Sequence, residues 1–177
     1  MTEKKELRKE MLAKRDALAG DEKEKYDVNI CAQIEAIIKA RDVKVVHTYL
    51  PMGSEININP LIEKMLAAGI TVVNPKALKQ RKLQNLVLNS LSELEEGIYG
   101  TQHPAGGNEY NGDIDLFVIP GLAFDTNNYR LGYGSGYYDT FLVTPPNAYK
   151  VGICYPFQVV DKVPTETHDV QLDKVVW

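Results

Sequence analysis

Hydrophobic residues recur at helical spacing in two consecutive segments at the start of the chain. Between Lys4 and Leu18 the apolar residues fall on one helical face, and lysine and arginine residues fill the opposite face. Gly20 is predicted to end this helix, and Asp21 to cap a second helix that runs to Ala40. The predicted buried stripe of the second helix consists of Val28, Cys31, Ile34, Ile37 and Ile38.

Short apolar runs follow, separated by one further helical pattern. The β-branched segment 43–49 and the segment 70–73 are predicted strands, the second of them closed by Asn74 and Pro75. A short helix is predicted between them at residues 60–68. A strand, a helix and a strand in this order are typical of a right-handed crossover in a parallel sheet.

The second half of the chain has a polar middle and three more apolar runs. Residues 83–88 are predicted to add a strand, and residues 97–112, rich in Gly, Asn and Pro, to form a long loop. The apolar run 115–119 is typical of a strand buried on both faces. Residues 151–154 and 172–176 are the last predicted strands. We therefore predict an α/β fold, a three-layer α/β/α sandwich with a largely parallel central sheet.

Composition and charge exclude several other classes of protein. With 177 residues, 44% of them hydrophobic and 25% charged, the chain fits a single domain spanning residues 1–177. A net charge of -4 argues against a general nucleic-acid binder. Cys31 and Cys154 are too few for a disulfide framework or a thiolate metal site. No apolar run suits a signal peptide or a membrane span, so we expect a cytoplasmic monomer that binds small molecules and neither nucleic acid nor membrane.

Glycine recurs at every second position in one segment that follows a predicted strand. Ligands of parallel sheets bind beyond the carboxyl ends of the strands, which points to residues 50–55 and 120–139. In the second of these, Gly132, Gly134 and Gly136 would let backbone N–H groups approach an anion closely. Alternating glycines also serve tight turns, so the glycines alone favour phosphate binding and a structural turn about equally.

Side chains around these glycines favour the phosphate interpretation. Arg130 can offer a guanidinium fork to a phosphate, and Asp139 can hold a magnesium ion. Tyr133, Tyr137 and Tyr138 offer flat faces to a heterocycle, although we expect at least one of them to be a packing residue.

Two motifs in this region resemble the signature of the 5-formyltetrahydrofolate cyclo-ligases. They are Val-Ile-Pro-Gly-Leu-Ala-Phe-Asp at 118–125 and Arg-Leu-Gly-Tyr-Gly-Ser-Gly-Tyr-Tyr-Asp at 130–139. The resemblance extends over almost the whole chain, through residues 4–8, 49–55 and 163–169. It implies the conversion of 5-formyltetrahydrofolate and ATP into 5,10-methenyltetrahydrofolate, ADP and phosphate, with Mg²⁺ as the cofactor.

The resemblance also implies roles for individual residues. It implies ATP binding by Lys4, Lys5, Arg8, Arg130, Leu131, Gly132, Tyr133, Gly134, Ser135, Gly136, Tyr137 and Tyr138. It implies substrate binding by Leu50, Glu55, Tyr133, Gly134, Ser135, Gly136 and Tyr137. Of these residues, Arg130 and Tyr137 would take part in catalysis, while Asp139 and Asp169 would hold the magnesium ion.

In the implied mechanism, the formyl oxygen attacks the γ-phosphate and forms an imidate phosphate, which a neighbouring nitrogen then captures. The protein would position the reactants and neutralise charge. One alternative is a catalytically silent nucleotide- or folate-binding protein on the same scaffold, against which Lys4, Arg8, Glu55 and Asp139 together weigh. A second alternative, an isomerase of sugar phosphates, lacks an identifiable general base.

Three positions depart from the pattern of the family. Ser135 and Thr140 stand where relatives often carry glycine or a basic residue, and His103 stands where glutamate is common. None of these departures removes an identified catalytic group. We expect His103 at the surface or beside the folate rather than as a metal ligand.

Overall fold

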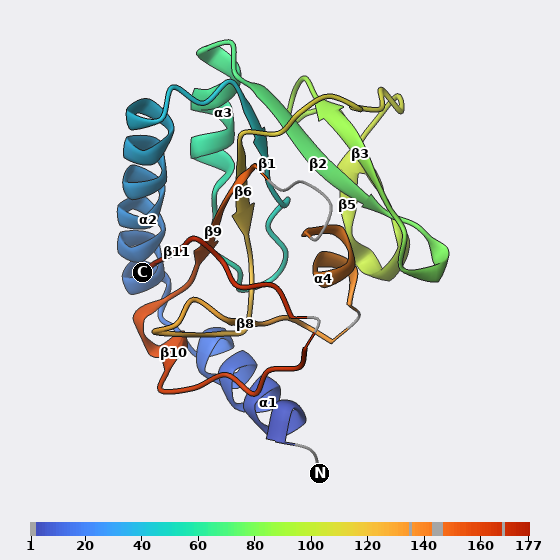
Figure 1. Ribbon diagram of the computed structural model, residues 1–177. Coiled ribbons are helices and arrows are strands. Elements are labelled where there is room, and N and C mark those ends of the chain that lie inside the picture. Colours follow the sequence, from blue (N-terminus) through green and yellow to red (C-terminus); the bar gives the residue numbers. More distant parts are fainter. Residues whose placement is uncertain (1–2, 135, 143–146, 168) are drawn as a thin grey trace.

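A six-stranded sheet forms the centre of the molecule (Figure 1). The computed structural model describes residues 3–134, 136–142, 147–167 and 169–177, and the side chains of Arg81, Asp139 and Thr140 lie outside this description. The strands are β1 (Val45–His47), β2 (Thr71–Ala77), β3 (Leu83–Leu88), β6 (Leu116–Ile119), β9 (Tyr149–Ile153) and β11 (Lys174–Val176). Their order is β11-β9-β6-β1-β2-β3. All neighbours run parallel except β2 and β3, which confirms a largely parallel sheet.

Helices cover both faces of this sheet, as the predicted three layers require. On one face, α2 (Gly20–Ala40) and α3 (Asn59–Ala67) pack against alternate strand residues, among them Leu116 and Val118 of β6. The intervening residues Phe117 and Ile119 point to the opposite face, where they pack with α4 (Tyr137–Leu142). Figure 1 shows α2 and α3 on one side of β6 and α4 on the other.

The first helix packs outside these layers, against a smaller sheet. That sheet has the order β10-β7-β8 and consists of β7 (Ala123–Asp125), β8 (Arg130–Leu131) and β10 (Val159–Val160). Met11 of α1 (Glu3–Asp16) is buried against Leu122, Leu131 and Val163. This packing places α1 beside the glycine-rich segment, which begins where β8 ends.

A hairpin and three short 3-10 helices complete the fold. The hairpin pairs β4 (Leu94–Glu96) with β5 (Gln102–Pro104), and the 3-10 helices are η1 (Lys79–Arg81), η2 (Ile98–Gly100) and η3 (Pro156–Gln158). The prediction of one loop over residues 97–112 is therefore wrong in part, because η2 and β5 lie within it. None of the helices within the described ranges is long and apolar enough to cross a bilayer.

Three local predictions about the first two helices and strands are wrong. Asp21 does not cap α2, which begins at Gly20 after Ala19 and has no side-chain cap. Val28 is 65% exposed and so lies outside the buried stripe. Pro75 does not end β2, since the strand continues to Ala77. Beyond Val73, β2 pairs with β3 alone, and a proline is tolerated in such an edge-like position.

Candidate functional site

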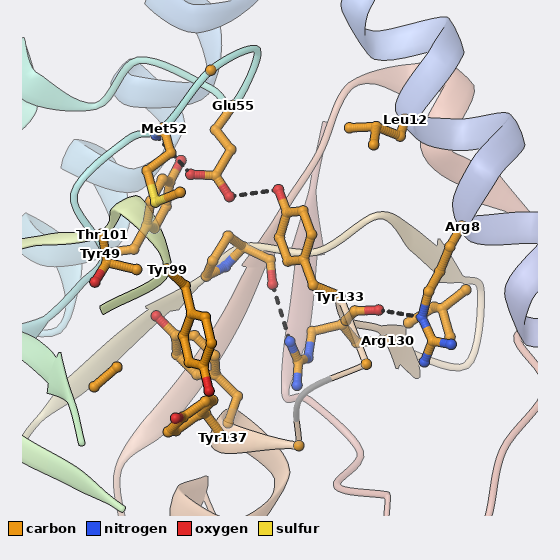
Figure 2. Close-up of a pocket in the computed structure, with 18 of the residues that line it drawn as sticks. Arg8, Leu12, Tyr49, Met52, Glu55, Tyr99, Thr101, Arg130, Tyr133 and Tyr137 are labelled. Atoms are coloured by element: carbon orange, nitrogen blue, oxygen red, sulfur yellow. Dashed lines mark hydrogen bonds between the residues drawn. The ribbon is translucent and has the colours of Figure 1, made fainter. Parts of the chain in front are cut away.

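A large cavity lies where the carboxyl ends of the parallel strands meet α1. Its volume is about 1020 Å³. Residues of α1, of the loop after β1, of the hairpin around η2, of the glycine-rich segment and of segment 164–169 line it. Figure 2 shows the side chains of these distant segments converging on one space. The fold thus brings the two sequence segments at the strand ends together, as predicted.

Most residues that the sequence nominated line this cavity. They are Lys4, Arg8, Leu50, Glu55, Arg130, Leu131, Gly132, Tyr133, Gly134, Gly136, Tyr137, Tyr138 and Asp169. Lys5 is exposed and is not among the lining residues of the described chain. Ser135 and the side chain of Asp139 lie outside the described residues.

We refer to Lys4, Arg8, Gly132, Gly134, Glu166 and Asp169 as the Lys4 end of the cavity. Lys4 Nζ lies 2.9 Å from Glu166 Oε1 and 3.3 Å from Asp169 Oδ2. Burial lowers the pKa of Lys4, but the hydrogen bonds and charges of Glu166 and Asp169 outweigh it, so the pKa is raised. Lys4 is therefore a cation held beside two carboxylates.

Two glycines of this end make room for arginine side chains. Arg8 Nε donates to the carbonyl oxygen of Gly132 over 2.9 Å. Gly134 has a φ of +100°, and a Cβ at this position would lie 3.1 Å from Arg8 Cζ. A Cβ at Gly132 would lie 3.0 Å from Arg130 Nη1. A Cβ at either position would require the guanidinium to shift by a few tenths of an ångström, and the positive φ of Gly134 further favours glycine there.

Arg130 and the tyrosines of α4 also line the cavity. Arg130 is 8% exposed, and its Nη1 donates to the carbonyl oxygen of Pro120 over 3.2 Å. Its Cζ lies 5.3 Å from the ring centroid of Tyr138. Tyr138 also packs into the core beneath α4, so the expectation of at least one packing tyrosine is confirmed. The Tyr137 hydroxyl donates to the carbonyl oxygen of Leu78 over 2.8 Å, which ties α4 to the end of β2.

We refer to Arg15, Tyr49, Met52, Ser54, Glu55 and Tyr133 as the Glu55 end. Glu55 is 8% exposed, and its two oxygens accept different hydrogen bonds. The Tyr133 hydroxyl donates to Oε1 over 2.7 Å, and the Met52 backbone N–H donates to Oε2 over 2.9 Å (Figure 2). Burial raises the pKa of Glu55, while the Tyr133 and Met52 hydrogen bonds and the charge of Arg15 oppose that rise. A buried carboxylate with oriented oxygens can accept hydrogen bonds from N–H groups of a ligand.

Arg15 and Tyr99 are among the cavity residues that the sequence did not nominate, and His103, outside the lining, was misplaced. Arg15 is buried at 5% exposure, although we predicted it on the solvent face of the first helix. Its helical spacing from Lys4 and Arg8 was the available signal. Tyr99, which is 77% exposed at the cavity, had no such signal. His103 is buried, with Nδ1 3.1 Å from the Pro104 carbonyl oxygen, so the expectation of a surface position is wrong.

Comparisons with known proteins agree with this site and fold. The whole chain, residues 1–177, matches the model of the 5-formyltetrahydrofolate cyclo-ligase family. A protein of Mycoplasma genitalium named 5-formyltetrahydrofolate cyclo-ligase is 32% identical, covering 99% of this chain and 98% of that protein. The Mus musculus protein of the same name is 26% identical, covering 98% of this chain and 93% of that protein.

Two solved structures resemble the fold closely. The NMR structure of the 5,10-methenyltetrahydrofolate synthetase of Aquifex aeolicus has a TM-score of 0.85 and 30% identity, over 98% of this chain and 89% of that one. The 5,10-methenyltetrahydrofolate synthetase of Mycoplasma pneumoniae has a TM-score of 0.80 and 29% identity, over 98% of both chains. The likeness therefore covers both the cavity and the framework around it.

Proposed function

The chain belongs to the 5-formyltetrahydrofolate cyclo-ligase family and is an enzyme of that kind, and on this premise we propose that it consumes ATP to convert 5-formyltetrahydrofolate into 5,10-methenyltetrahydrofolate. One observation carries the proposal: a single cavity has cations and glycines at one end and a buried, oriented carboxylate at the other. The cationic end suits a nucleoside triphosphate, and the carboxylate end suits a folate held beside it.

The Lys4 end is the proposed nucleotide site. Lys4 and Arg8 stand one helical turn apart on α1, and Arg130 faces the same cavity from β8. Guanidinium and ammonium groups are suited to phosphate oxygens, and the glycines leave backbone N–H groups accessible to them. Lys4 would exchange its present carboxylate partners for phosphate when ATP binds.

The Glu55 end is the proposed folate site. A pterin carries N–H donors along one edge, and the Glu55 carboxylate is an acceptor aimed into the cavity. Leu50 and the rings of Tyr133 and Tyr99 line the same space and offer apolar surface to the heterocycle. Bound in this way, the folate would lie with its formyl group toward Arg130 and the nucleotide.

The proposed chemistry needs no nucleophilic side chain. The formyl oxygen attacks the γ-phosphorus, the bond from that phosphorus to ADP breaks, and an imidate phosphate forms. The neighbouring amine nitrogen then attacks the formyl carbon and loses its proton, and phosphate leaves with the former formyl oxygen. Lys4, Arg8 and Arg130 would neutralise the charge that moves during both steps and keep the reactants in contact. Tyr137 is a further proposed catalytic residue, since it lines the same cavity as Arg130.

Magnesium is the proposed cofactor, with Asp169 and Asp139 as its protein ligands. Asp169 and Glu166 place carboxylate oxygens at the Lys4 end, and oxygen is the donor that magnesium prefers. Within the described ranges no group of three or more His, Cys, Asp or Glu residues could hold a metal by itself. A magnesium ion commonly takes only one or two carboxylates and completes its shell with phosphates and water, so the residues present fit this use. The ion would neutralise phosphate charge when bound.

Absorbance of the methenyl product tests the proposed reaction. We expect its long-wavelength band to appear when the protein is mixed with 5-formyltetrahydrofolate, magnesium and ATP, and not when ATP is omitted. Arg130→Ala should lower the rate by about 100-fold or more, as loss of a preorganised cationic donor does elsewhere. Arg41→Ala is the matched control, because Arg41 lies away from the cavity against Tyr149. ATP binding without any band would leave a catalytically silent binding protein as the better account.

We further propose that the enzyme works as a cytoplasmic monomer on small molecules alone. The central sheet, the three apolar clusters and the cavity are all completed within one chain. Sedimentation at working concentration should give one species of the chain's mass, and a dimer would contradict this part of the proposal.

A further inference from the structure

One face of α1 borders the cavity along the whole length of the helix. Lys4, Arg8, Leu12 and Arg15 all line it, at successive spacings that keep them on one helical face. The first two belong to the Lys4 end, whereas Arg15 lies at the Glu55 end. Figure 2 shows Arg8 and Leu12 pointing from α1 toward the cavity. A cation placed beside the proposed folate site has no role in the function described so far.

Arg15 contacts Ser54, the residue before Glu55 in the sequence, and Tyr133, which donates a hydrogen bond to Glu55. Its Nε donates to Ser54 Oγ over 3.0 Å, and Ser54 directly precedes Glu55. Its Cζ lies 5.6 Å from the ring centroid of Tyr133, whose hydroxyl donates to Glu55. The Ser54 hydroxyl donates in turn to Asp16. Two consecutive residues of α1, Arg15 and Asp16, are thus hydrogen-bonded to the loop after β1.

The Arg15 guanidinium has no carboxylate partner of its own in the described part of the chain. No carboxylate oxygen there lies within 4.0 Å of it, although the side chain is 5% exposed. An almost buried cation without a direct counterion is costly, and its field acts strongly on neighbouring charges. The Arg15 charge acts to lower the pKa of Glu55, after the larger contributions of the Tyr133 and Met52 hydrogen bonds.

Other titratable groups that face Glu55 are tyrosines and one surface carboxylate. Tyr49 follows β1, Tyr133 lies in the glycine-rich segment, Tyr138 belongs to α4, and Tyr155 lies beyond β9. Burial raises the pKa of each of these tyrosines, so all four are neutral at neutral pH. Asp16 lies behind Ser54 and is exposed. Among these neighbours, Arg15 is thus the cation that can favour the ionised form of Glu55.

We infer that Arg15 is a positioning residue for the folate site, which orients the Glu55–Tyr133 pair and keeps Glu55 in its carboxylate form. The inference rests on the proposed function, because it assigns the Glu55 carboxylate to the N–H edge of a pterin. A protonated Glu55 accepts hydrogen bonds poorly, so folate affinity should fall as pH falls through the Glu55 pKa. Without Arg15, that fall should begin at higher pH.

Titration calorimetry with 5-formyltetrahydrofolate alone, at several pH values between about 5 and 8.5, tests this inference without requiring turnover. Arg15→Gln should weaken binding about tenfold at neutral pH and shift the acid limb upward by about one pH unit. Arg15→Lys keeps the charge and should leave that limb close to its wild-type position. ATP affinity should stay within about twofold in both variants, because the change is confined to one end of the cavity.

Two controls separate this role from a merely structural one. Lys14→Gln removes an exposed cation of the same helix that pairs with Glu10, and should change neither affinity nor the pH limb. In a Glu55→Gln background, Arg15→Gln should no longer shift the limb, because the titrating group is gone. Near-ultraviolet circular dichroism of each variant checks that it is folded, and Arg15→Met, which also removes the charge, replaces Arg15→Gln if that variant is not folded.

The outcomes distinguish this inference from the proposed function. An unmoved acid limb in Arg15→Gln, an equal shift in Arg15→Lys, or a matching loss of ATP affinity would overturn the role of Arg15 while the cyclo-ligase proposal stands. Wild-type protein that binds no 5-formyltetrahydrofolate at any pH would overturn both.

Discussion

The two ends of the cavity stabilise their charged side chains in different ways. At the Lys4 end, the Lys4 side chain is 21% exposed and pairs with Glu166, which is 56% exposed. At the Glu55 end, the carboxylate is 8% exposed, and a tyrosine hydroxyl and a backbone N–H orient its oxygens. Partly exposed ion pairs are weak and exchange readily, whereas a satisfied buried network holds one geometry.

This difference indicates which part of the site must rearrange when a ligand binds and which part is already formed. An incoming phosphate group has to displace or join the carboxylates around Lys4, and solvent exposure makes that exchange inexpensive. A pterin, in contrast, would meet the Glu55 carboxylate, which is already largely removed from water and oriented by its hydrogen bonds. We therefore expect changes at the Glu55 end to act on folate affinity through lost preorganisation, and changes at the Lys4 end to act on ATP affinity.

Among the changes that act on the difference in ligand affinity between the two ends, Glu55→Gln is expected to have the largest effect. An amide presents a donor where the carboxylate accepts, and hydrogen bonds to a charged group contribute about 1.5–3 kcal/mol. We expect 5-formyltetrahydrofolate affinity to fall about tenfold to 100-fold, with ATP affinity unchanged, in calorimetric titrations with each ligand. Glu95→Gln, on the exposed surface of β4, is the matched control. Equal losses for both ligands would mean that the two ends do not act separately.

Arg8→Ala should give the opposite pattern at the Lys4 end. The change removes a cation from the proposed phosphate site and frees the Gly132 carbonyl oxygen that Arg8 Nε holds. The KM for ATP should rise about tenfold, which corresponds to one charge-assisted hydrogen bond, while the KM for folate stays within about twofold. Lys9→Ala removes the next, exposed cation of α1 and should leave both constants unchanged. A larger rise in the folate KM than in the ATP KM would show that Arg8 acts on the folate rather than on ATP.

Tyr133→Phe tests the buried network at its shared hydrogen bond. The change deletes only the hydroxyl that donates to Glu55 over 2.7 Å and keeps the ring against Arg15. We expect folate affinity to fall about fivefold to tenfold, less than for Glu55→Gln, because the carboxylate itself remains. Tyr110→Phe is a suitable control, since the Tyr110 hydroxyl donates to the Asp113 carbonyl oxygen away from the cavity. Unchanged folate affinity in Tyr133→Phe would show that the hydroxyl does not orient Glu55.

The smallest effect on the binding of either ligand is expected from substitution of His47. This residue instead affects the stability of the fold at low pH, and so limits the pH range of the other measurements. His47 is fully buried in β1, with its ring 4.9 Å from that of Phe117 and 5.1 Å from that of Phe141. Burial lowers its pKa to about 3, against a smaller opposing contribution from Asn85.

Because the unfolded histidine titrates near 6.5, the unfolded state binds the extra proton below that pH, and the protein loses stability as pH falls. The free energy of unfolding should decrease by about 2 kcal/mol at pH 5 relative to neutral pH through this residue alone. Urea unfolding at both pH values measures the decrease, and His47→Leu should reduce it. An equal pH dependence in His47→Leu would assign the lost stability to other groups.

The sequence pattern predicts the layered α/β architecture, and most of the residues that it nominated line the cavity. An apolar run such as 115–119 predicts a strand that is buried on both faces, and β6 confirms this prediction. The strand-end rule likewise placed segments 50–55 and 120–139 at one edge, and residues of both segments line the cavity. These features depend on local pattern and on the general geometry of parallel sheets, which a single sequence carries.

The contacts of individual side chains, in contrast, depend on how distant segments pack together. Arg15 looks like one more solvated cation in the helical pattern, yet α1 packs through Met11 so that Arg15 is buried beside Ser54 and Tyr133. The strand through Pro75 continues because β1 ends early and leaves one side of β2 unpaired. Glu55, a loop glutamate in sequence, becomes a buried acceptor through Tyr133, which lies 78 residues away. Such contacts join segments far apart in the chain, so their energies cannot be read from local spacing.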